Sequence, residues 1–250
     1  MRVGYWLNHD YYRLSVKDYV EEFCGWTALK QLIVDYATQG RDQAFLTTLF
    51  LTGGRVSEVL ALQKTNFEVR EPEGLILVRN MPLLKRYKKL SKDEEGKWIT
   101  QKLVKTRKPF PIRLAEPLTP ILLEWLEKNE GLLFPSPYKI GFPLSRHWAY
   151  HLIRVLDSQL PRDLKEELGL NKKFIKTVEG KQVEIADVLH LWLHWFRSQR
   201  ASQLVSDYGY EVIDLIDYFS WLRYDTALTY ARKGWRGLAA KMQVAQVTYV

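Results

Sequence analysis

The stretch LTGGRVSEVLAL, residues 51–62, interrupts the helical pattern of the chain and places an arginine at the interruption. Its two consecutive glycines allow backbone angles that other residues avoid, so they predict the end of the preceding helix. Ser57 can cap a new helix that runs to the end of the stretch. We therefore expect Arg55 at a tight turn between two helices, with Glu58 three residues further along.

Helical and extended patterns alternate on either side of this turn. Before it, two segments with apolar residues at helical spacing, separated by Gly40, predict two helices. After it, β-branched and aromatic residues predict strands over 75–84 and 98–114, with KTRK at 105–108 as a short turn. Further helices are predicted over residues 119–129, 145–159, 185–207, 211–219 and 225–241.

Length and composition favour one main domain. A chain of 250 residues that is 46% hydrophobic can bury one substantial core, whereas residues 1–24 lack a clear period and are interpreted as an extension or a linker remnant. Cys24 is the only cysteine, which excludes an internal disulfide and a cysteine-based zinc cluster and fits a reducing compartment. Because no apolar run reaches the roughly 18 residues that span a bilayer, we expect a soluble, cytoplasmic protein.

The net charge of +8 is concentrated in one segment. Residues 79–113 contain twelve basic and three acidic residues, whereas the rest of the chain contains 25 basic and 26 acidic residues. A charge run can be merely a solvated loop, but confining the whole excess to one segment indicates a surface for a polyanion, with double-stranded DNA as the leading candidate.

The stretch HWFRSQRASQL, residues 194–204, places His194 and Arg197 on one face of a predicted helix. A histidine beside an arginine is costly to bury without an anionic partner, and a phosphate would satisfy both. His190 and His194 also have the spacing of a zinc-binding helix. Leu191 replaces the general-base glutamate of such sites and no third ligand is evident, so we expect no metal.

The stretch SWLRYDTALTYAR, residues 220–232, places Trp221 nine residues before Tyr230. A tyrosine at helical spacing usually packs in a core. Here it follows, in one order along the chain, an arginine at a turn, a lysine in a hairpin and a histidine–arginine pair. That order favours a catalytic tyrosine.

Together these motifs resemble the tyrosine recombinases, or integrases, which include the Cre, lambda integrase and Xer groups. LTGGRVSEVLAL is similar to the family's first arginine box, in which the arginine follows a T-G-x turn and an acidic residue follows three positions later. HWFRSQRASQL is similar to the H-x-x-R box with its following small and hydroxyl residues, here Ala201 and Ser202, and it looks more like archaeal than bacterial integrases. Trp221 and Tyr230 match the family's H/W position and nucleophile. The resemblance covers residues 25–235.

The resemblance implies an α+β fold, a mostly helical catalytic domain over residues 25–250 with a small antiparallel β-sheet or hairpin. Most members also carry an N-terminal DNA-clamping domain, and only 24 residues precede the catalytic region here. The chain is accordingly interpreted as an excised fragment or a short, single-domain member. We expect the apolar tail, about residues 237–250, to dock on a neighbouring protomer of a tetramer on DNA, with packing on its own domain as the alternative.

The resemblance also implies a role for each site residue. Tyr230 attacks the scissile phosphate, forms a 3′-phosphotyrosyl link and releases a 5′-hydroxyl. Arg55 and Arg197 bind the non-bridging oxygens, for which planar bidentate donors are well suited. His194 assists proton movement at the tyrosine, and Trp221 packs beside the phosphate. Since the covalent intermediate conserves the free energy of the phosphodiester, the reaction needs no ATP, metal or cofactor.

The remaining assignments concern the basic segment and the neighbours of the arginines. Lys105 in VKTRK best matches the family's general acid, a lysine in a hairpin turn, with Lys85 and Lys108 as alternatives. Glu58 is expected to orient its neighbours. Arg200 occupies a position where many members have an aromatic residue. The residues expected to contact DNA are Lys85, Arg86, Lys88, Lys89, Lys102, Arg107 and Lys108.

Two other functions fit part of this pattern. A type IB topoisomerase uses similar chemistry, but it usually has a basic residue in place of His194. A catalytically idle DNA-binding relative is the second alternative, and an intact Tyr230 with both arginines argues against it. The sequence does not indicate the target site or whether the biological role is integration, excision, inversion or dimer resolution.

Overall fold

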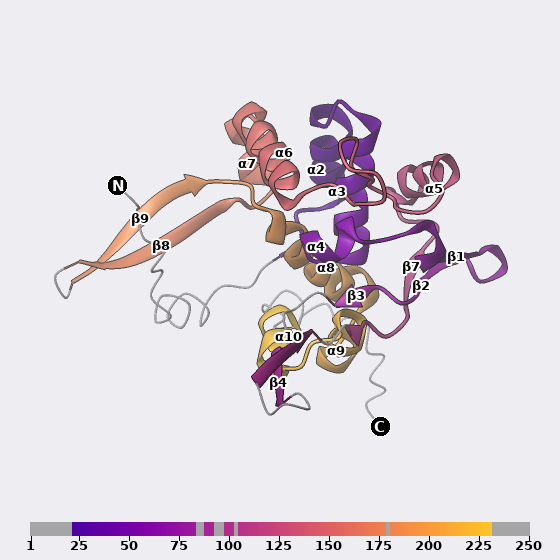
Figure 1. The fold of residues 1–250 in the computed structure, drawn as a ribbon. Coiled ribbons are helices and arrows are strands. Elements are labelled where there is room, and N and C mark those ends of the chain that lie inside the picture. The colour runs from indigo at the N-terminus through magenta and orange to yellow at the C-terminus, as the bar shows by residue number, and fades with distance from the viewer. Residues whose placement is uncertain (1–21, 84–87, 93–97, 103–104, 179–180, 232–250) are drawn as a thin grey trace, which may run out of the picture.

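The computed structural model describes residues 22–83, 88–92, 98–102, 105–178 and 181–231 (Figure 1). The helices in this part of the chain are α2 (Trp26–Gln31), α3 (Gly40–Thr52), α4 (Val56–Leu60), α5 (Thr119–Lys128), α6 (Arg146–Gln159), α7 (Arg162–Glu167), α8 (Leu193–Tyr208), α9 (Val212–Phe219) and α10 (Tyr224–Ala231). The strands are β1 (Phe67–Arg70), β2 (Leu75–Val78), β3 (Pro82–Leu83), β4 (Lys88–Lys92), β5 (Trp98–Lys102), β6 (Lys105–Thr106), β7 (Phe110–Arg113), β8 (Asn171–Val178) and β9 (Lys181–Leu189).

Helix α3 forms the centre of the helical body. Ten of its thirteen residues are buried, which is typical of a helix surrounded by protein on all sides. It packs against α5 and α8, and a π-helical turn, η1 (Leu32–Tyr36), extends α2 beside it. The buried hydroxyl of Thr52 donates to the carbonyl oxygen of Thr48, so this polar side chain is satisfied within the helix.

A three-stranded antiparallel sheet with the order β1-β2-β7 packs one face on the core. Ile76 pairs with Ile112 and Val78 with Phe110, and all four side chains are buried. The intervening residues are more exposed, as expected for a sheet that is covered on one face. The mostly helical α+β architecture with a small antiparallel sheet agrees with the sequence-based expectation.

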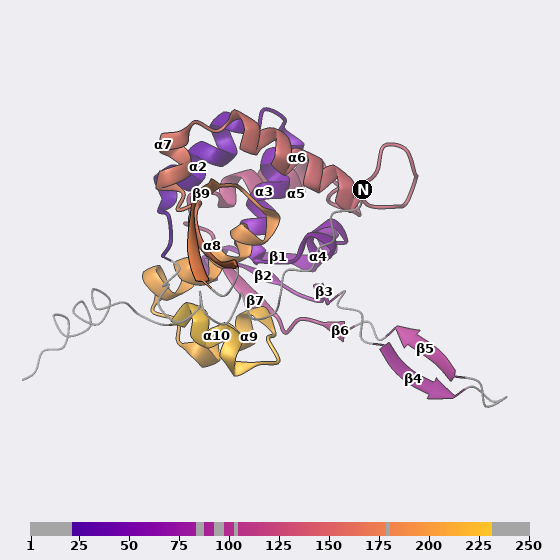
Figure 2. The same cartoon turned by 90° about the vertical axis from the view of Figure 1, so that its left-hand side faces the viewer.

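Strands β2 and β7 continue outward as an arm. Pro82 pairs with Thr106 and Leu83 with Lys105, and further out β4 pairs with β5. Figure 2 shows β4 and β5 projecting from the body beyond β3 and β6. The expected turn at residues 105–108 is therefore wrong, because Lys105 and Thr106 lie in β6, which pairs with β3.

Residues 171–189 form a second long hairpin, β8–β9, which projects from the body in Figure 1. The sequence analysis assigned residues 185–207 to one helix, and this is wrong for its first part, which belongs to β9. Helix α8 begins only at Leu193. Val183, Ile185 and Val188 supply the β-branched residues that favour a strand, although the apolar spacing alone also fits a helix.

The helix predictions over 119–129, 145–159 and 211–219 are confirmed with small shifts at the ends, and that over 225–241 is confirmed for residues 225–231, beyond which it lies outside the described residues. Ser145 caps α6 by accepting a hydrogen bond from the Trp148 main-chain N–H at 3.2 Å. Helix α4 differs, because Arg55 rather than Ser57 is its N-cap residue. The sequence analysis missed the short helix α7.

The described chain begins ahead of the expected domain boundary. Phe23 stacks on Phe50 of α3 with ring centroids 6.1 Å apart, and the Cys24 main-chain N–H donates to the Gln199 side chain at 2.8 Å. These contacts join residues 23 and 24 to the helical body.

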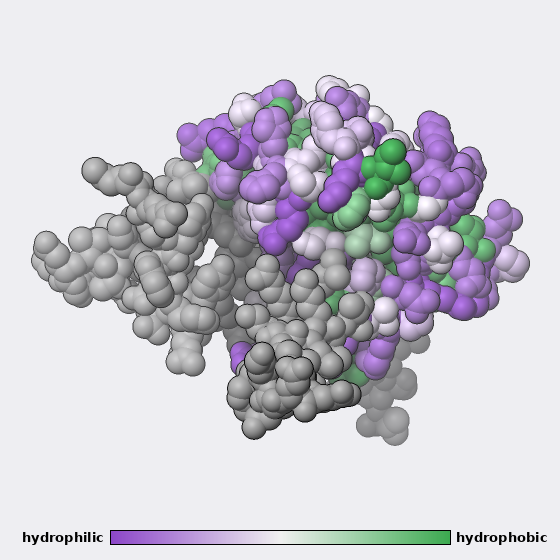
Figure 3. All heavy atoms as spheres, in the orientation of Figure 1, coloured by the Kyte–Doolittle hydropathy of each residue, from purple (hydrophilic) through white to green (hydrophobic). Residues whose placement is uncertain are grey.

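On the face shown in Figure 3, hydrophilic side chains predominate among the coloured residues, with small apolar groups between them. Among the described residues, no helix has both the length and the apolar content that crossing a membrane requires.

Candidate active site

Arg55 is held at the junction of α3 and α4 by its own helix cap. Gly53 ends α3 with a positive φ of 54°, and a Cβ there would collide with the Phe219 ring. The Arg55 main-chain N–H donates to Glu58 Oε2 at 2.9 Å, and its Nη1 donates to Glu58 Oε1 at 2.7 Å. Glu58 is fully buried. Its two carboxylate oxygens accept these two hydrogen bonds and fix the orientation of Arg55. The side chain of Arg55 is still 39% exposed.

Arg197 approaches the same turn from α8. It is buried, and its Nη1 donates to the main-chain oxygen of Gly53 at 2.5 Å. Its Nη2 is buried without a hydrogen-bond partner among the described residues. Burial, together with repulsion from Arg107 and Arg55, lowers the pKa of Arg197 to about 9. The arginine is therefore a desolvated cation with an unused donor.

Trp221 and Tyr230 complete an aromatic stack over the arginine. The ring centroids of Phe219 and Trp221 lie 4.5 Å apart, and those of Trp221 and Tyr230 lie 5.4 Å apart, both pairs being nearly parallel. The guanidinium carbon of Arg197 lies 4.7 Å from the Phe219 centroid. The hydroxyl of Tyr230 lies 3.1 Å from the hydroxyl of Ser198, which follows Arg197 on α8.

These residues share one cavity of about 230 Å³. It receives side chains from the α3–α4 turn, strand β3, helix α8, the α9–α10 corner and helix α10. Its lining comprises Arg55, Leu83, His194, Arg197, Ser220, Trp221, Leu222, Arg223, Thr226 and Tyr230. The structure thus brings together five of the six residues assigned as catalytic, which come from positions far apart in the sequence.

Lys105, the sixth, lies at the edge of this group. It is exposed on β6 and pairs with Leu83, which lines the cavity. Of the two alternatives, Lys108 is exposed and its Nζ lies 2.5 Å from Asp217 Oδ1. Lys85 lies outside the described residues. Lys108 adjoins the cavity as well, because its main-chain N–H donates to the hydroxyl of Ser220, another lining residue.

The other expected DNA contacts have different locations. Arg86 lies outside the described residues. Lys88, Lys89 and Lys102 lie on the projecting strands β4 and β5, of which only the backbone is described. Arg107 is not at the surface as expected, because its side chain is only 2% exposed and points into the body. No signal in the sequence separates this buried arginine from its neighbours in the basic run.

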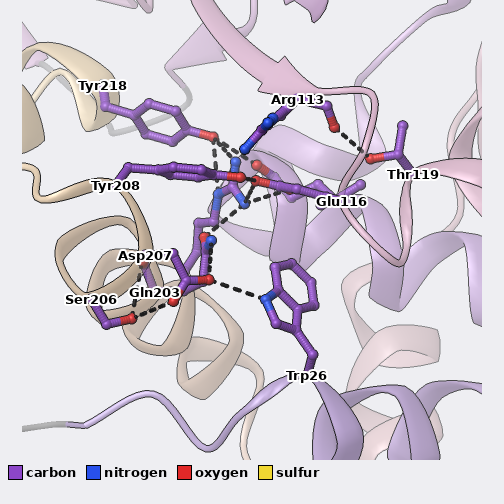
Figure 4. Close-up of polar contacts among 11 residues, drawn as sticks. Trp26, Arg113, Glu116, Thr119, Gln203, Ser206, Asp207, Tyr208 and Tyr218 are labelled. Atoms are coloured by element: carbon purple, nitrogen blue, oxygen red, sulfur yellow. Dashed lines mark hydrogen bonds and ion pairs between the residues drawn. The ribbon is translucent and has the colours of Figure 1, made fainter. Parts of the chain in front are cut away.

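Arg200, which the sequence left without explanation, belongs to a buried polar network. Figure 4 shows Glu116, Tyr208 and Tyr218 of this network. Arg200 Nη1 lies 2.7 Å from Glu116 Oε2, and both side chains are buried. Its Nε and Nη2 donate to the Tyr218 hydroxyl, while the Tyr208 hydroxyl donates to Glu116 at 2.6 Å. The network links α8 to α9 and to the segment before α5, so it fixes the helix that carries Arg197.

His190 has a partner other than a metal. Its Nδ1 lies 2.7 Å from Asp157 Oδ2, and Asp157 also accepts the Leu191 main-chain N–H at 2.8 Å. Within the described ranges no group of three or more His, Cys, Asp or Glu side chains is arranged to hold a metal ion.

A second cavity of about 260 Å³ adjoins the first. Arg55 and His194 line both cavities, and Arg146 and Tyr150 of α6 complete the second. The guanidinium of Arg146 donates to the Tyr150 hydroxyl at 3.2 Å. Arg146, Tyr150 and Ser198 were not predicted from the sequence, because only the fold brings α6 beside the arginine turn and α10 beside Ser198.

The fold defined above is that of the tyrosine recombinase catalytic domain. The structure of XerA recombinase matches with a TM-score of 0.52 and 16% identity, over 92% of this chain and 67% of XerA. The Tn1549 transposon integrase in complex with transposon right end DNA matches with a TM-score of 0.51 and 11% identity, over 88% of this chain and 64% of the integrase. This chain thus spans about two thirds of the length of each. Neither a family model nor a curated protein sequence matches it.

Proposed function

We propose that this chain is the catalytic domain of a site-specific tyrosine recombinase or integrase. It would cut and rejoin double-stranded DNA through a covalent bond between Tyr230 and a backbone phosphate. The observation that carries the proposal is the cavity lined by Tyr230, Arg55 and Arg197, in which a buried arginine keeps a donor without a partner. The recombinase fold shared with XerA and the Tn1549 integrase supports it.

Phosphoryl transfer to tyrosine needs a nucleophile, compensation of charge on the phosphate and a proton for the leaving oxygen. The Tyr230 oxygen would form the new bond to phosphorus as the bond to the 5′ oxygen breaks. Arg197 Nη2 and the exposed part of Arg55 would bind the non-bridging oxygens, where negative charge concentrates. Lys105 would protonate the leaving 5′ oxygen, and His194 would accept the tyrosine proton.

The surroundings of these groups fit their roles. Glu58 and the Gly53 carbonyl each use one arginine Nη1, so both guanidiniums are oriented before DNA arrives. Preorganised donors stabilise a transition state without a cost of reorganisation at the moment of reaction. Trp221, stacked between Phe219 and Tyr230, would keep the nucleophile next to the phosphate and limit the access of water.

We further propose a homotetramer on DNA in the cytoplasm, associated with the nucleoid, with the basic segment as its main DNA contact. The recombinase reaction exchanges strands between two duplexes, and each duplex presents two cleavage sites. Four catalytic domains would therefore act together.

A nicked suicide substrate tests the reaction directly. Cleavage near the nick releases a short fragment, so religation fails and a covalent protein–DNA adduct accumulates on a denaturing gel. Wild-type protein should form the adduct without ATP or metal. Tyr230→Phe should form none while binding DNA with nearly unchanged affinity, since one hydroxyl adds little to a many-phosphate contact.

Three results would contradict parts of the proposal. A wild-type protein that binds DNA but never forms an adduct would be an idle binder. Adducts that persist in Tyr230→Phe would move the nucleophile to another residue. Relaxation of supercoiled DNA without exchange between two labelled duplexes would identify a type IB topoisomerase activity.

A further inference from the structure

Arg107 makes contacts that a DNA-binding residue would not need. Its Nη1 donates to the main-chain oxygen of Thr52 at 2.8 Å, and its Nη2 donates to the main-chain oxygen of Tyr218. Thr52 is the last residue of α3, and Tyr218 lies in the last turn of α9. The terminal carbonyls of a helix lack partners within it and carry the negative end of its dipole. One guanidinium therefore caps two helices.

The interior position of Arg107 is stabilised by these carbonyls and by an aromatic ring. Its guanidinium carbon lies 4.0 Å from the Phe110 centroid. Burial lowers the pKa of Arg107 to about 10, which indicates how strongly the cation is desolvated. Burying a charged side chain is costly unless it is paired. The buried contacts of Arg107 therefore indicate a structural or positioning role, which an exposed lysine would not fill.

The two helix ends that Arg107 joins both lead into the candidate active site. The turn after Thr52 carries Arg55, and the corner after Tyr218 carries Ser220 and Trp221. Arg107 itself follows Lys105 by two residues, and its main-chain N–H donates to the Met81 oxygen at 2.8 Å at the base of the arm. The next residue strengthens the link, because the Lys108 N–H donates to the Ser220 hydroxyl at 3.2 Å.

We propose that Arg107 is a positioning residue that fixes the Lys105 strand against the phosphate-binding pocket. The arm projects from the body, so small tilts at its base would move Lys105 relative to Arg55 and Arg197. The guanidinium links the base of this arm to the two helix ends that border the pocket. This inference rests on the proposed function and adds a residue to its machinery.

The test compares cleavage of two suicide substrates, one with the ordinary 5′-bridging oxygen and one with a 5′-bridging sulfur. A thiolate is a good leaving group and needs almost no proton, so the sulfur substrate bypasses the general acid. Arg107→Met should cleave the oxygen substrate about 100-fold slower, the effect expected when a catalytic group is misplaced by about 1 Å. Most of this loss should disappear with sulfur, as in Lys105→Ala measured in parallel.

Several controls separate positioning from other roles. Arg107→Met should keep the DNA affinity and salt dependence of the wild type, because its guanidinium does not reach the surface. Asp217→Asn, which removes the exposed ion pair to Lys108 nearby, should cleave both substrates at close to the wild-type rate. Arg107→Lys keeps a buried cation with fewer donors and should show an intermediate loss with the same recovery on sulfur. This variant also serves if Arg107→Met does not fold.

The outcomes distinguish this inference from the proposed function. If wild-type protein forms no adduct on either substrate, the proposed function itself fails. If the wild type forms adducts but the Arg107 variants cleave both substrates at the wild-type rate, or are equally slow on both, Arg107 does not position the acid and the inference alone is overturned. A weaker salt dependence of DNA binding in Arg107→Met would show that Arg107 contacts DNA directly.

Discussion

Arg197 illustrates how the site is prepared for an anion at the level of single residues. Burial lowers the pKa of this cation most, two further arginines, Arg107 and Arg55, lower it more, and the carboxylate of Glu58 offsets only part of the effect. A phosphate that bound Nη2 would supply a hydrogen-bond acceptor and negative charge at once. Attraction between the phosphate and the clustered arginines would then offset the repulsion among the arginines. This attraction would be strongest where negative charge builds up in the transition state.

The role of Lys105 can be tested by its substrate dependence. Lys105→Ala should cleave ordinary DNA about 10²- to 10⁴-fold slower, the usual contribution of general acid catalysis. Its rate should recover with a 5′-bridging sulfur, whereas Arg55→Ala and Arg197→Ala should stay slow because they act on charge at phosphorus. Single-turnover rates on matched oxygen and sulfur substrates measure this. Recovery in Lys85→Ala or Lys108→Ala, but not in Lys105→Ala, would assign the acid to that residue instead.

At the scale of elements, helix α8 contributes both to the cavity and to the buried polar network. Its exposed His194 and its buried Arg197 line the cavity, and Arg200, three residues further along, pairs with Glu116. The ion pair thus holds the stretch of helix from which Arg197 presents an unsatisfied donor.

The Arg200–Glu116 pair should contribute strongly to stability once it is formed. Glu116→Gln leaves a buried arginine without its carboxylate and should lower the free energy of unfolding by about 3–5 kcal/mol. Urea denaturation measures the change. Arg200→Met combined with Glu116→Leu should cost less than either single change, because no buried charge then lacks a partner. A double variant whose loss equals the sum of the single losses would show that the two residues do not interact energetically.

The hairpin arm should dominate non-specific DNA binding. Replacing Lys85, Arg86, Lys88 and Lys89 by glutamine should reduce the slope of log affinity against log salt by about 0.9 for each lost phosphate contact. Binding titrations from low to moderate salt give this slope. Lys128→Gln on α5, which pairs with Glu124 on the surface, is the matched control and should change the slope little. An equal slope in the four-residue variant would mean that the arm is only solvated.

At the scale of the whole molecule, the cavity depends on the convergence of distant segments. Four parts of the chain meet there, namely the α3–α4 turn, the base of the arm, α8 and the α9–α10 pair. The buried contacts of Arg107 and Arg200 connect these parts to one another. Contact between α10 and both α8 and α9 places Tyr230 in the cavity of its own chain. In the proposed reaction, assembly with other copies would therefore serve strand exchange rather than complete this cavity.

The apolar C-terminal segment provides a test of assembly, although it lies outside the described residues. Deleting residues 243–250 should impair strand exchange between two duplexes more than cleavage of an isolated suicide site, because docking on a neighbouring protomer matters only in the assembled complex. Exchange and cleavage assays at equal protein concentration compare the two. Equal losses in both would favour packing of this segment on its own domain.

The sequence by itself determined the local features of the site. Two glycines set the turn before Arg55, three-residue spacing put His194 and Arg197 on one helix, and nine residues separate Trp221 from Tyr230. Each of these follows from backbone sterics or helical period, which act over a few residues. The helices and the small antiparallel sheet could be predicted for the same reason.

Only the tertiary structure decided which residues are buried and which segments are neighbours in space. Arg107 and Lys105 belong to the same basic run, yet one is buried between two helix ends and the other lies in an exposed strand. Strand β9 replaced the first five residues of the helix predicted over 185–207, because the apolar spacing of residues 185–189 fits either structure until pairing selects one. Burial, strand pairing and cavity lining depend on long-range contacts, and a local pattern does not contain them.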